Sequence, residues 1–387
     1  MSKDAAAGRI ASLPTTIFST MSRLAAEHHA VNLGQGFPDF DGPEWIMEEA
    51  FRAMKEGKNQ YAPMNGVRTF RRAIAGYQKK YYDLEWDPET EITVTAGATE
   101  ALFSTMLALI DEGDEVVMFE PFYDSHRANT ILAGGIPRYV TLRKPDFHFD
   151  PDELERIVSN RTRMLILNNP HNPTGKVYSR EELEFIADLA RRFDFLVLSD
   201  EVYEFLTYDD AVHVPMATLP GMRERTITVS SMGKTFGMTG WKLGFAAARP
   251  SLTGAIQKVH QFVTFAVNTP GQHAMAYALG RLESYLAEFR ASYLRKRDFL
   301  LEGLTETIFN PHAPNGSYFV MVDIPPELGE DDVACAMRLV RDHGVAVIPP
   351  SAFYGASDEG RTMLRLCFAK KEETLKEGLE RLRRVSI

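Results

Sequence analysis

Short apolar runs alternate with longer amphipathic segments between residues 92 and 229. The runs are too short for ordinary helices and are rich in β-branched residues, so they predict strands at 92–95, 115–119, 138–142, 164–167, 195–198 and 227–229. The segments between them predict helices at 99–108, 123–134, 151 onward and 180–192. This alternation indicates an α/β fold with a mostly parallel sheet covered by helices on both faces.

Helical spacing dominates before residue 90. It predicts helices over 15–29, between Pro43 and Gly57, and up to about Asp83. Within the second helix, the expected buried stripe consists of Met47, Ala50, Phe51 and Met54.

The pattern changes again after about residue 275. A long helical segment is predicted to about Thr307, followed by strands at 317–323, 345–348 and 363–368 with helices at 331–342 and 371–384. We therefore expect a large domain over 43–275 and a smaller α+β domain over 276–387. Residues 1–42 are expected to complete the smaller domain.

Composition narrows the class of protein. The chain has 387 residues, of which 44% are hydrophobic and 25% charged, with a formal net charge of −10. Without a basic block, nucleic acid is an unexpected partner.

Cys335 and Cys367 lie far apart without metal-ligand spacing, which suits a reducing compartment and no metal site. No apolar run approaches the roughly 18 residues of a membrane helix or forms a signal core, so we expect a cytoplasmic protein without a membrane partner.

The candidate chemistry follows the ends of the predicted strands. Ligands in such sheets lie at the carboxyl ends of the strands. Polar motifs occur there at 97–99, 168–170, 199–200 and 230–231. This agreement predicts one binding site along that edge of the sheet.

Lys234 stands in a tight loop directly after the strand at 227–229. The sequence around it looks like the end of a P-loop, but that motif needs a glycine where Thr228 stands. Two interpretations remain, a solvated lysine and a covalent anchor for pyridoxal 5′-phosphate (PLP). Gly97, Ala98 and Thr99 open a helix and could offer backbone N–H groups to a phosphate, although the same residues also suit a simple turn. Ser231 and Lys242 could reach the same dianion.

Other strand-end residues match the remaining parts of PLP. Asp200 could hold a pyridine nitrogen protonated, or could cap a turn. Tyr203 and Asn172 could hydrogen-bond the ring hydroxyl. Arg365, on a predicted strand, is suited to a substrate carboxylate, although a single arginine on a strand is more often a surface ion pair.

Four motifs occur together in one order: NPTG at 172–175, SDEVY at 199–203, SMGK at 231–234 and RLCF at 365–368. Together they resemble the class I/II aminotransferases of PLP fold type I, over essentially the whole chain. NLGQGFPDF at 32–40, NQY at 59–61, TVTAGATEAL at 93–102 and GWKLG at 240–244 are similar to bacterial methionine aminotransferases and the kynurenine aminotransferase/glutamine transaminase K group.

This resemblance implies a seven-stranded sheet and a role for each motif. Lys234 would be the covalent anchor of PLP and the proton shuttle, Asp200 the partner of the pyridine nitrogen, and Tyr203 a ligand of the ring oxygen. The remaining cofactor contacts would come from Gly97, Ala98, Thr99, Tyr123, Asn172, Ser231 and Lys242. Tyr61 would reach the cofactor phosphate of a neighbouring subunit, which requires a homodimer with shared active sites.

The resemblance also implies a substrate site. Gly36, Asn172 and Arg365 would bind the α-carboxylate, and Phe18, Phe265 and Phe353 would line the side-chain pocket. The chain departs from relatives specialised for kynurenine at Ala266, where they often have histidine, and at Phe18, where tryptophan is common. We therefore expect ping-pong transfer of the amino group of methionine, an aromatic or a similar L-amino acid to a 2-oxo acid.

Two alternatives differ in class. A cysteine-S-conjugate β-lyase would use the same cofactor and residues, and would release pyruvate without an acceptor. A non-catalytic effector-binding module would predict a fused DNA-binding domain, which a chain filled by the catalytic fold does not provide. Hydrolase motifs such as Gly-x-Ser-x-Gly and His-Glu-x-x-His do not occur in the sequence.

Overall fold

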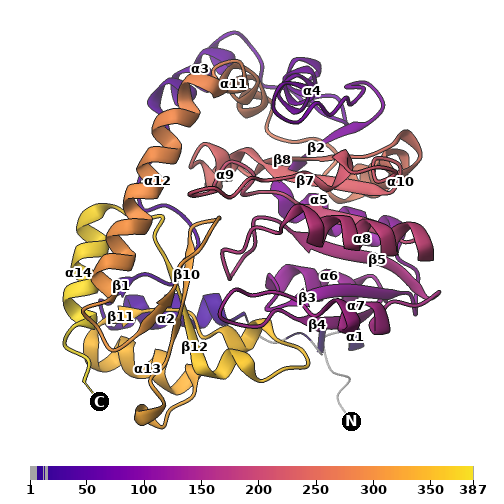
Figure 1. Cartoon of the computed structure of the whole chain (residues 1–387). Coiled ribbons are helices and arrows are strands. Elements are labelled where there is room, and N and C mark those ends of the chain that lie inside the picture. The colour runs from indigo at the N-terminus through magenta and orange to yellow at the C-terminus, as the bar shows by residue number, and fades with distance from the viewer. Residues whose placement is uncertain (1–6, 12, 14–15, 387) are drawn as a thin grey trace, which may run out of the picture.

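The computed structural model describes residues 7–11, 13 and 16–386. A seven-stranded sheet lies at its centre, in the order β2-β8-β7-β6-β5-β3-β4 (Figure 1). β8 runs antiparallel to β2 and β7, and the other neighbouring strands are parallel. The prediction of a mostly parallel, seven-stranded sheet is confirmed. Its strands are β2 Ile92–Ala96, β3 Glu115–Glu120, β4 Ile136–Thr141, β5 Thr162–Asn168, β6 Leu196–Asp200, β7 Thr226–Ser231 and β8 Leu243–Ala247.

β8 is the strand that the hydrophobic pattern did not predict. Its sequence, LGFAA, contains glycine and alanine, which have low strand propensity. A Cβ on Gly244 would lie 2.7 Å from the Ser230 carbonyl oxygen and 2.8 Å from the Ala98 nitrogen. The small residue therefore allows β8 to approach both β7 and the turn after β2.

Helices cover both faces of this sheet. Val116 and Met118 of β3 pack with residues of α5 and α10 on one face. Val117 and Phe119 point the other way and pack with residues of α7 and α8. These alternating contacts confirm the predicted covering of both faces. The helices are α5 Gly97–Leu109, α6 Asp124–Leu132, α7 Pro151–Ile157, α8 Arg180–Phe193 and α10 Pro250–Val263.

α3 (Glu44–Lys55) buries a different face from the one predicted. Met47, Phe51 and Met54 are 38%, 55% and 43% exposed, so their assignment to a buried stripe was wrong. The buried residues are Ile46, Ala50 and Ala53, which form the face toward α11 (Thr269–Leu279). Alanines permit a close approach of two helices, whereas the larger residues remain at the surface.

The long helix predicted from residue 275 is divided in two. α11 ends at Leu279, and α12 (Leu282–Leu304) begins after Gly280 and Arg281. In Figure 1, α12 extends from the neighbourhood of α3 and α11 toward β10 and α14. It thus joins the elements around the central sheet to the smaller sheets.

Two smaller sheets contain the remaining strands. β9, β10 and β12 are antiparallel, whereas β1 pairs in parallel with β11. β11 is shorter than predicted, because Ile348 instead forms a bridge with Arg365. β1 brings the N-terminal segment to this part of the chain, and the predicted domain boundaries remain a prediction. The strands are β1 Val31–Asn32, β9 Asn310–His312, β10 Phe319–Asp323, β11 Val345–Ala346 and β12 Met363–Cys367.

Of the remaining helices, α2, α13 and α14 contact the smaller sheets, whereas α1, α4 and α9 contact the central sheet or its helices. The helix predicted over 15–29 is observed as α2, and residue 15 lies outside the described residues. The remaining helices are α1 Gly8–Ala11, α2 Ile17–Glu27, α4 Arg68–Tyr82, α9 Met232–Thr235, α13 Asp332–His343 and α14 Glu372–Leu382.

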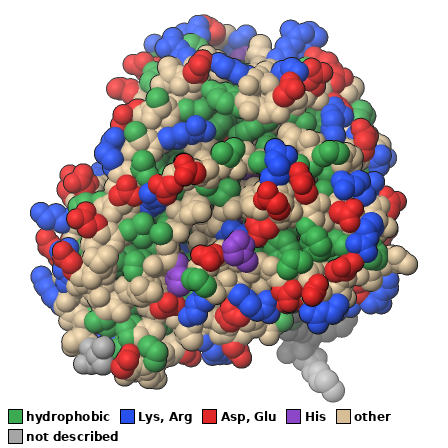
Figure 2. All heavy atoms as spheres, in the orientation of Figure 1, with side chains coloured by type: hydrophobic (Ala, Val, Ile, Leu, Met, Phe, Trp, Pro, Cys, Tyr) green, Lys and Arg blue, Asp and Glu red, His purple; other side chains and the backbone are tan. Residues whose placement is uncertain are grey.

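Three further features concern membrane helices, metal sites and surface charge. Among the described residues, no helix combines the length and apolarity needed to cross a membrane. In the same part of the chain, no group of three or more His, Cys, Asp or Glu residues is arranged to hold a metal ion. Figure 2 shows basic and acidic side chains interspersed over the visible face.

The capping box of α8 gives a test of this fold. The Ser179 hydroxyl accepts from the Glu182 N–H at 3.2 Å, and the Glu182 carboxylate accepts from the Ser179 N–H at 2.8 Å. Ser179→Ala leaves one N–H of the first turn without its acceptor, so we expect unfolding stability to fall by about 1 kcal/mol. Chemical denaturation measures this, with Ser292→Ala within α12 as the control. Equal stability of the two variants would contradict the capping role.

Candidate active site

A cavity of about 280 Å³ lies where the carboxyl ends of the parallel strands meet the N-terminal segment and β12. The sheet places its polar strand ends along one edge, as the sequence predicts. Thirteen of the predicted site residues line this cavity. They are Phe18, Gly36, Gly97, Ala98, Thr99, Tyr123, Asn172, Asp200, Tyr203, Ser231, Lys234, Lys242 and Arg365.

Three predicted residues lie elsewhere. Phe353 is buried behind the cavity wall, with its ring stacked on Phe18 at 5.6 Å between centroids. Tyr61 and Phe265 contact each other at 5.3 Å between ring centroids and belong to the surface, where Tyr61 is 82% exposed. The structure therefore does not bring Tyr61 or Phe265 into the cavity of their own subunit.

Lys234 lines the cavity. β7 delivers it through the short helix α9, and its Nζ donates to the hydroxyl of Tyr318 at 2.8 Å and to the Gly36 carbonyl at 3.2 Å. Burial lowers the pKa of Lys234 to about 8, although Cys367 and Asp200 act in the opposite direction. A lysine with this pKa is neutral in a much larger fraction near physiological pH than an exposed lysine is, and the neutral amine is the reactive form.

A helix start suited to an anion lines the cavity. Gly97 begins α5 with φ +72°, a conformation that suits glycine, and the free N–H groups of a helix start favour an anion. Lys242 reaches the same turn and donates to the Thr99 hydroxyl at 2.9 Å. Ser231 at the end of β7 completes this side of the cavity.

A buried carboxylate lies at another wall. Asp200 is the last residue of β6, and its Oδ2 is 3.2 Å from His126 Nε2. Asn168 at the end of β5 donates to the Asp200 carbonyl at 3.0 Å. The strand-end motifs do not single out His126, so its contact with Asp200 was not predicted. The signal was its position one helical turn after Tyr123, which faces the same cavity.

A second missed histidine has a different role. His171 is buried beside Thr174, with Nδ1 2.8 Å from the hydroxyl. Burial lowers the pKa of His171 to about 3, so the ring is neutral and supports the NPTG loop.

Arg365 and Asn172, the predicted carboxylate ligands, are brought into contact by the fold. Arg365 on β12 donates to Asn172 Oδ1 at 3.1 Å and to the Gly34 carbonyl at 2.7 Å. Among the described residues, its Nε has no hydrogen-bond partner. The guanidinium also lies 4.2 Å from the Phe319 ring centroid and 5.0 Å from that of Phe18. A desolvated guanidinium with an unused N–H is suited to a carboxylate.

These residues fit PLP. The cavity joins a lysine amine, an anion-binding helix start and a buried carboxylate backed by histidine. PLP carries an aldehyde, a phosphate and a ring nitrogen, which are the chemical partners of those three groups. Lys234 would hold the aldehyde carbon, the turn of Gly97 with Lys242 the phosphate, and Asp200 the nitrogen.

Comparisons with known proteins agree with this arrangement. The family model for aminotransferases of class I and II matches residues 28–382. The chain is 43% identical to a methionine aminotransferase of Escherichia coli over 97% of both chains. It is 38% identical to a kynurenine–oxoglutarate transaminase of Dictyostelium discoideum, over 95% of this chain and 93% of the relative.

A solved structure is equally similar. The N-succinyldiaminopimelate aminotransferase of Mycobacterium tuberculosis superposes with a TM-score of 0.95 at 43% identity, covering 98% of this chain and 99% of that one. These three relatives have different substrates in their names, so similarity alone does not select a substrate.

The environment of Lys234 predicts a pH dependence in the apoprotein. Below a pH of about 8 the amine is mainly protonated and unreactive, and above it the neutral amine is available for arylation. We expect the rate of modification of Lys234 by trinitrobenzenesulfonate to rise with a midpoint near pH 8. Mass spectrometry of the modified peptide measures this rate, and Lys376 on α14 provides the reference curve. A Lys234 curve that coincides with that of Lys376 would contradict the desolvated site.

Proposed function

The chain belongs to the class I and II aminotransferases, and from this premise we propose that it acts on L-amino acids with uncharged side chains, methionine and aromatic amino acids among them. Enzymes of this family depend on PLP and transfer an amino group from an amino acid to a 2-oxo acid. One observation supports the substrate proposal. Every cation that lines the cavity is assigned to the cofactor or to the α-carboxylate, which all amino-acid substrates share, so none is left for a charged substrate side chain.

Three cationic side chains line the cavity among the described residues. Lys234 serves the cofactor aldehyde, Lys242 the phosphate and Arg365 the α-carboxylate. A substrate with a second carboxylate, such as an N-succinyldiaminopimelate, would bring that charge into a region without a fourth cation from these residues. Burial of an unpaired charge is costly, which favours substrates with uncharged side chains.

Aromatic side chains support the same proposal. Phe18 and Phe319 line the cavity beside Arg365, and Phe353 packs behind Phe18. Aromatic rings contact thioether sulfur and other aromatic rings favourably. Such a pocket separates apolar substrates by only about 1–3 kcal/mol per methylene, so several donors are expected to overlap.

The residues of the chain divide the work of the reaction. When bound, PLP supplies an electron sink for the bond broken at the α-carbon. Arg365 and Asn172 hold the substrate carboxylate, which orients the α-hydrogen toward Lys234. The neutral Lys234 amine would accept that proton and return it to the aldehyde carbon of the cofactor. The Asp200 carboxylate, held by His126, would stabilise the protonated form of the ring nitrogen.

A homodimer accounts for the residues that lie outside the cavity. Tyr61 and Phe265 lie together at the surface, and Phe262 nearby in sequence is 89% exposed. The exposed Met47, Phe51 and Met54 of α3 add large apolar side chains. Large apolar side chains exposed in such numbers favour a protein–protein interface. We propose that a second copy covers them, and that Tyr61 and Phe265 then enter the partner's active site.

The remaining assignments are also proposals. Two free cysteines, Cys335 and Cys367, are both buried and support a location in the reducing cytoplasm. The pairing of β1 with β11 and the course of α12 support a large domain over 43–275 and a smaller one formed by 1–42 and 276–387.

A donor comparison tests the substrate proposal. We expect kcat/KM for L-methionine and L-phenylalanine to exceed that for L-glutamate and N-succinyl-LL-diaminopimelate by about 100-fold or more, because the distal carboxylate would be buried unpaired. Norleucine serves as the uncharged control without sulfur. The formation of pyridoxamine phosphate and oxo acid in single turnovers measures each donor. A preference for the anionic donors would overturn the substrate class, and ammonia with pyruvate from a cysteine conjugate would indicate β-lyase activity.

Mixed dimers test the shared site. A Tyr61→Ala subunit retains Lys234 but should leave the partner's phosphate site incomplete. Paired with a Lys234→Ala subunit, it receives an intact Tyr61, so one site of the mixed dimer is complete. We expect doubly tagged mixed dimers to show about half of the wild-type specific activity. Lys234→Ala paired with Arg365→Ala is the control, which leaves no complete site, and equal activity of both pairs would contradict the shared site.

A further inference from the structure

Three segments distant in sequence meet at the amine of Lys234. Lys234 comes from α9, Tyr318 immediately precedes β10, and Gly36 belongs to the segment after β1. Lys234 Nζ donates to the Tyr318 hydroxyl at 2.8 Å and to the Gly36 carbonyl at 3.2 Å. The Tyr318 hydroxyl itself donates to the same carbonyl at 2.6 Å. The three groups therefore form a closed hydrogen-bonded triangle.

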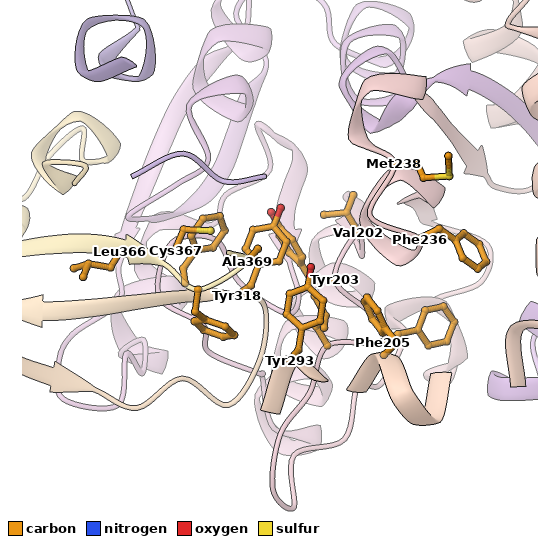
Figure 3. Packing of buried hydrophobic residues seen from close by; sticks show 14 of the residues in the cluster. Val202, Tyr203, Phe205, Phe236, Met238, Tyr293, Tyr318, Leu366, Cys367 and Ala369 are labelled. Carbon is orange, nitrogen blue, oxygen red and sulfur yellow. The ribbon is translucent and has the colours of Figure 1, made fainter. Parts of the chain in front are cut away.

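The surrounding structure fixes the Tyr318 hydroxyl in place. Its backbone carbonyl accepts from the Phe368 N–H at 3.0 Å, and the carbonyl of the preceding Ser317 accepts from the Tyr208 hydroxyl at 2.6 Å. The Tyr318 ring meets Tyr203 edge-on at 5.0 Å and stacks on Tyr293 at 6.1 Å between centroids. Figure 3 shows these three tyrosines gathered in the buried cluster. The hydroxyl is thus held by a rigid ring.

The available donors and acceptors determine how the lysine is oriented. A tyrosine hydroxyl has one proton, and that proton is directed to the Gly36 carbonyl, so its oxygen accepts from Lys234. A neutral amine has two N–H bonds and one lone pair. The Tyr318 and Gly36 oxygens are 2.6 Å apart, so both accept from the same side of Nζ. The lone pair is left for the side of Nζ that lines the cavity.

We propose that Tyr318 is a positioning residue for transamination: with the Gly36 carbonyl it anchors one side of the Lys234 amine by hydrogen bonds and so turns the lone pair toward the substrate α-hydrogen. In this step the N–H bond forms as the Cα–H bond breaks, and the electron pair passes to the bound cofactor. The inference rests on the proposed function. Tyr318 acts through Lys234 and does not itself accept the proton.

Other groups near Lys234 remain in place when the hydroxyl is removed. Asp200 comes from β6, Cys367 and Arg365 from β12, and Lys242 from the turn before β8. Tyr203 faces Lys234 with its ring, 5.9 Å from Nζ to the centroid. Tyr318→Phe removes one hydroxyl, which interacts with the Tyr203 side chain as well as with Lys234.

The kinetic arm of the test compares Tyr318→Phe with Tyr293→Phe. The control removes a hydroxyl from the tyrosine stacked on Tyr318. For Tyr318→Phe we expect kcat with L-methionine to fall about 10- to 100-fold, because a misdirected base slows proton transfer, while KM changes less than about 3-fold. The isotope effect with α-deuterated methionine should increase. We expect Tyr293→Phe to keep wild-type values for all three.

The apoprotein arm needs no turnover. The Tyr318 oxygen accepts from the lysine and favours its protonated form, so its loss should lower the midpoint of Lys234 modification by about one pH unit. Thermal unfolding of both variants checks that each is folded. Unchanged midpoint and unchanged kcat in Tyr318→Phe, or equal losses in Tyr293→Phe, would overturn the inference. Wild-type enzyme that takes no amino group from uncharged donors would instead overturn the proposed function, whatever the midpoint shift.

Discussion

Desolvation of one lysine amine is the constraint on which the active site depends. Lys234 is held between the Gly36 carbonyl and the Tyr318 hydroxyl, and burial brings its pKa to about 8. A buried ammonium is disfavoured, so the same packing that orders the amine also makes it reactive. The strand order of the central sheet, the N-terminal segment and the smaller antiparallel sheet all converge on this group.

Each of the other charged side chains in the cavity lies beside a particular neighbour. Lys242 lies with the phosphate turn, Arg365 with Asn172, and Asp200 with His126. Each charged group has a neighbour that fixes its direction, which preorganises the site before substrate arrives. Among the described cavity residues, no cation is present beyond Lys234, Lys242 and Arg365, and Phe18 and Phe319 supply aromatic walls beside Arg365.

The surface of α3 illustrates how a helical pattern can have two solutions. Met47, Phe51 and Met54 have the spacing of a buried face, yet Ile46, Ala50 and Ala53 occupy that position against α11. Hydrophobic spacing identifies a helix. It does not show which of two apolar faces packs within the subunit and which remains at its surface. The large residues suit an interface with a second copy, and so does the pair formed by Tyr61 and Phe265.

The sequence by itself determined most of the sheet and the chemistry at its edge. The alternation of short apolar runs with helical segments predicted all central strands except β8. Lys234, Asp200 and the Gly97 turn follow strand ends in the sequence, and because parallel strands end along one edge of a sheet, they were predicted to lie together. Only the tertiary structure decided which side chains touch these groups. Tyr318 lies 84 residues from Lys234, and its contact depends on the packing of distant segments, which no local pattern records.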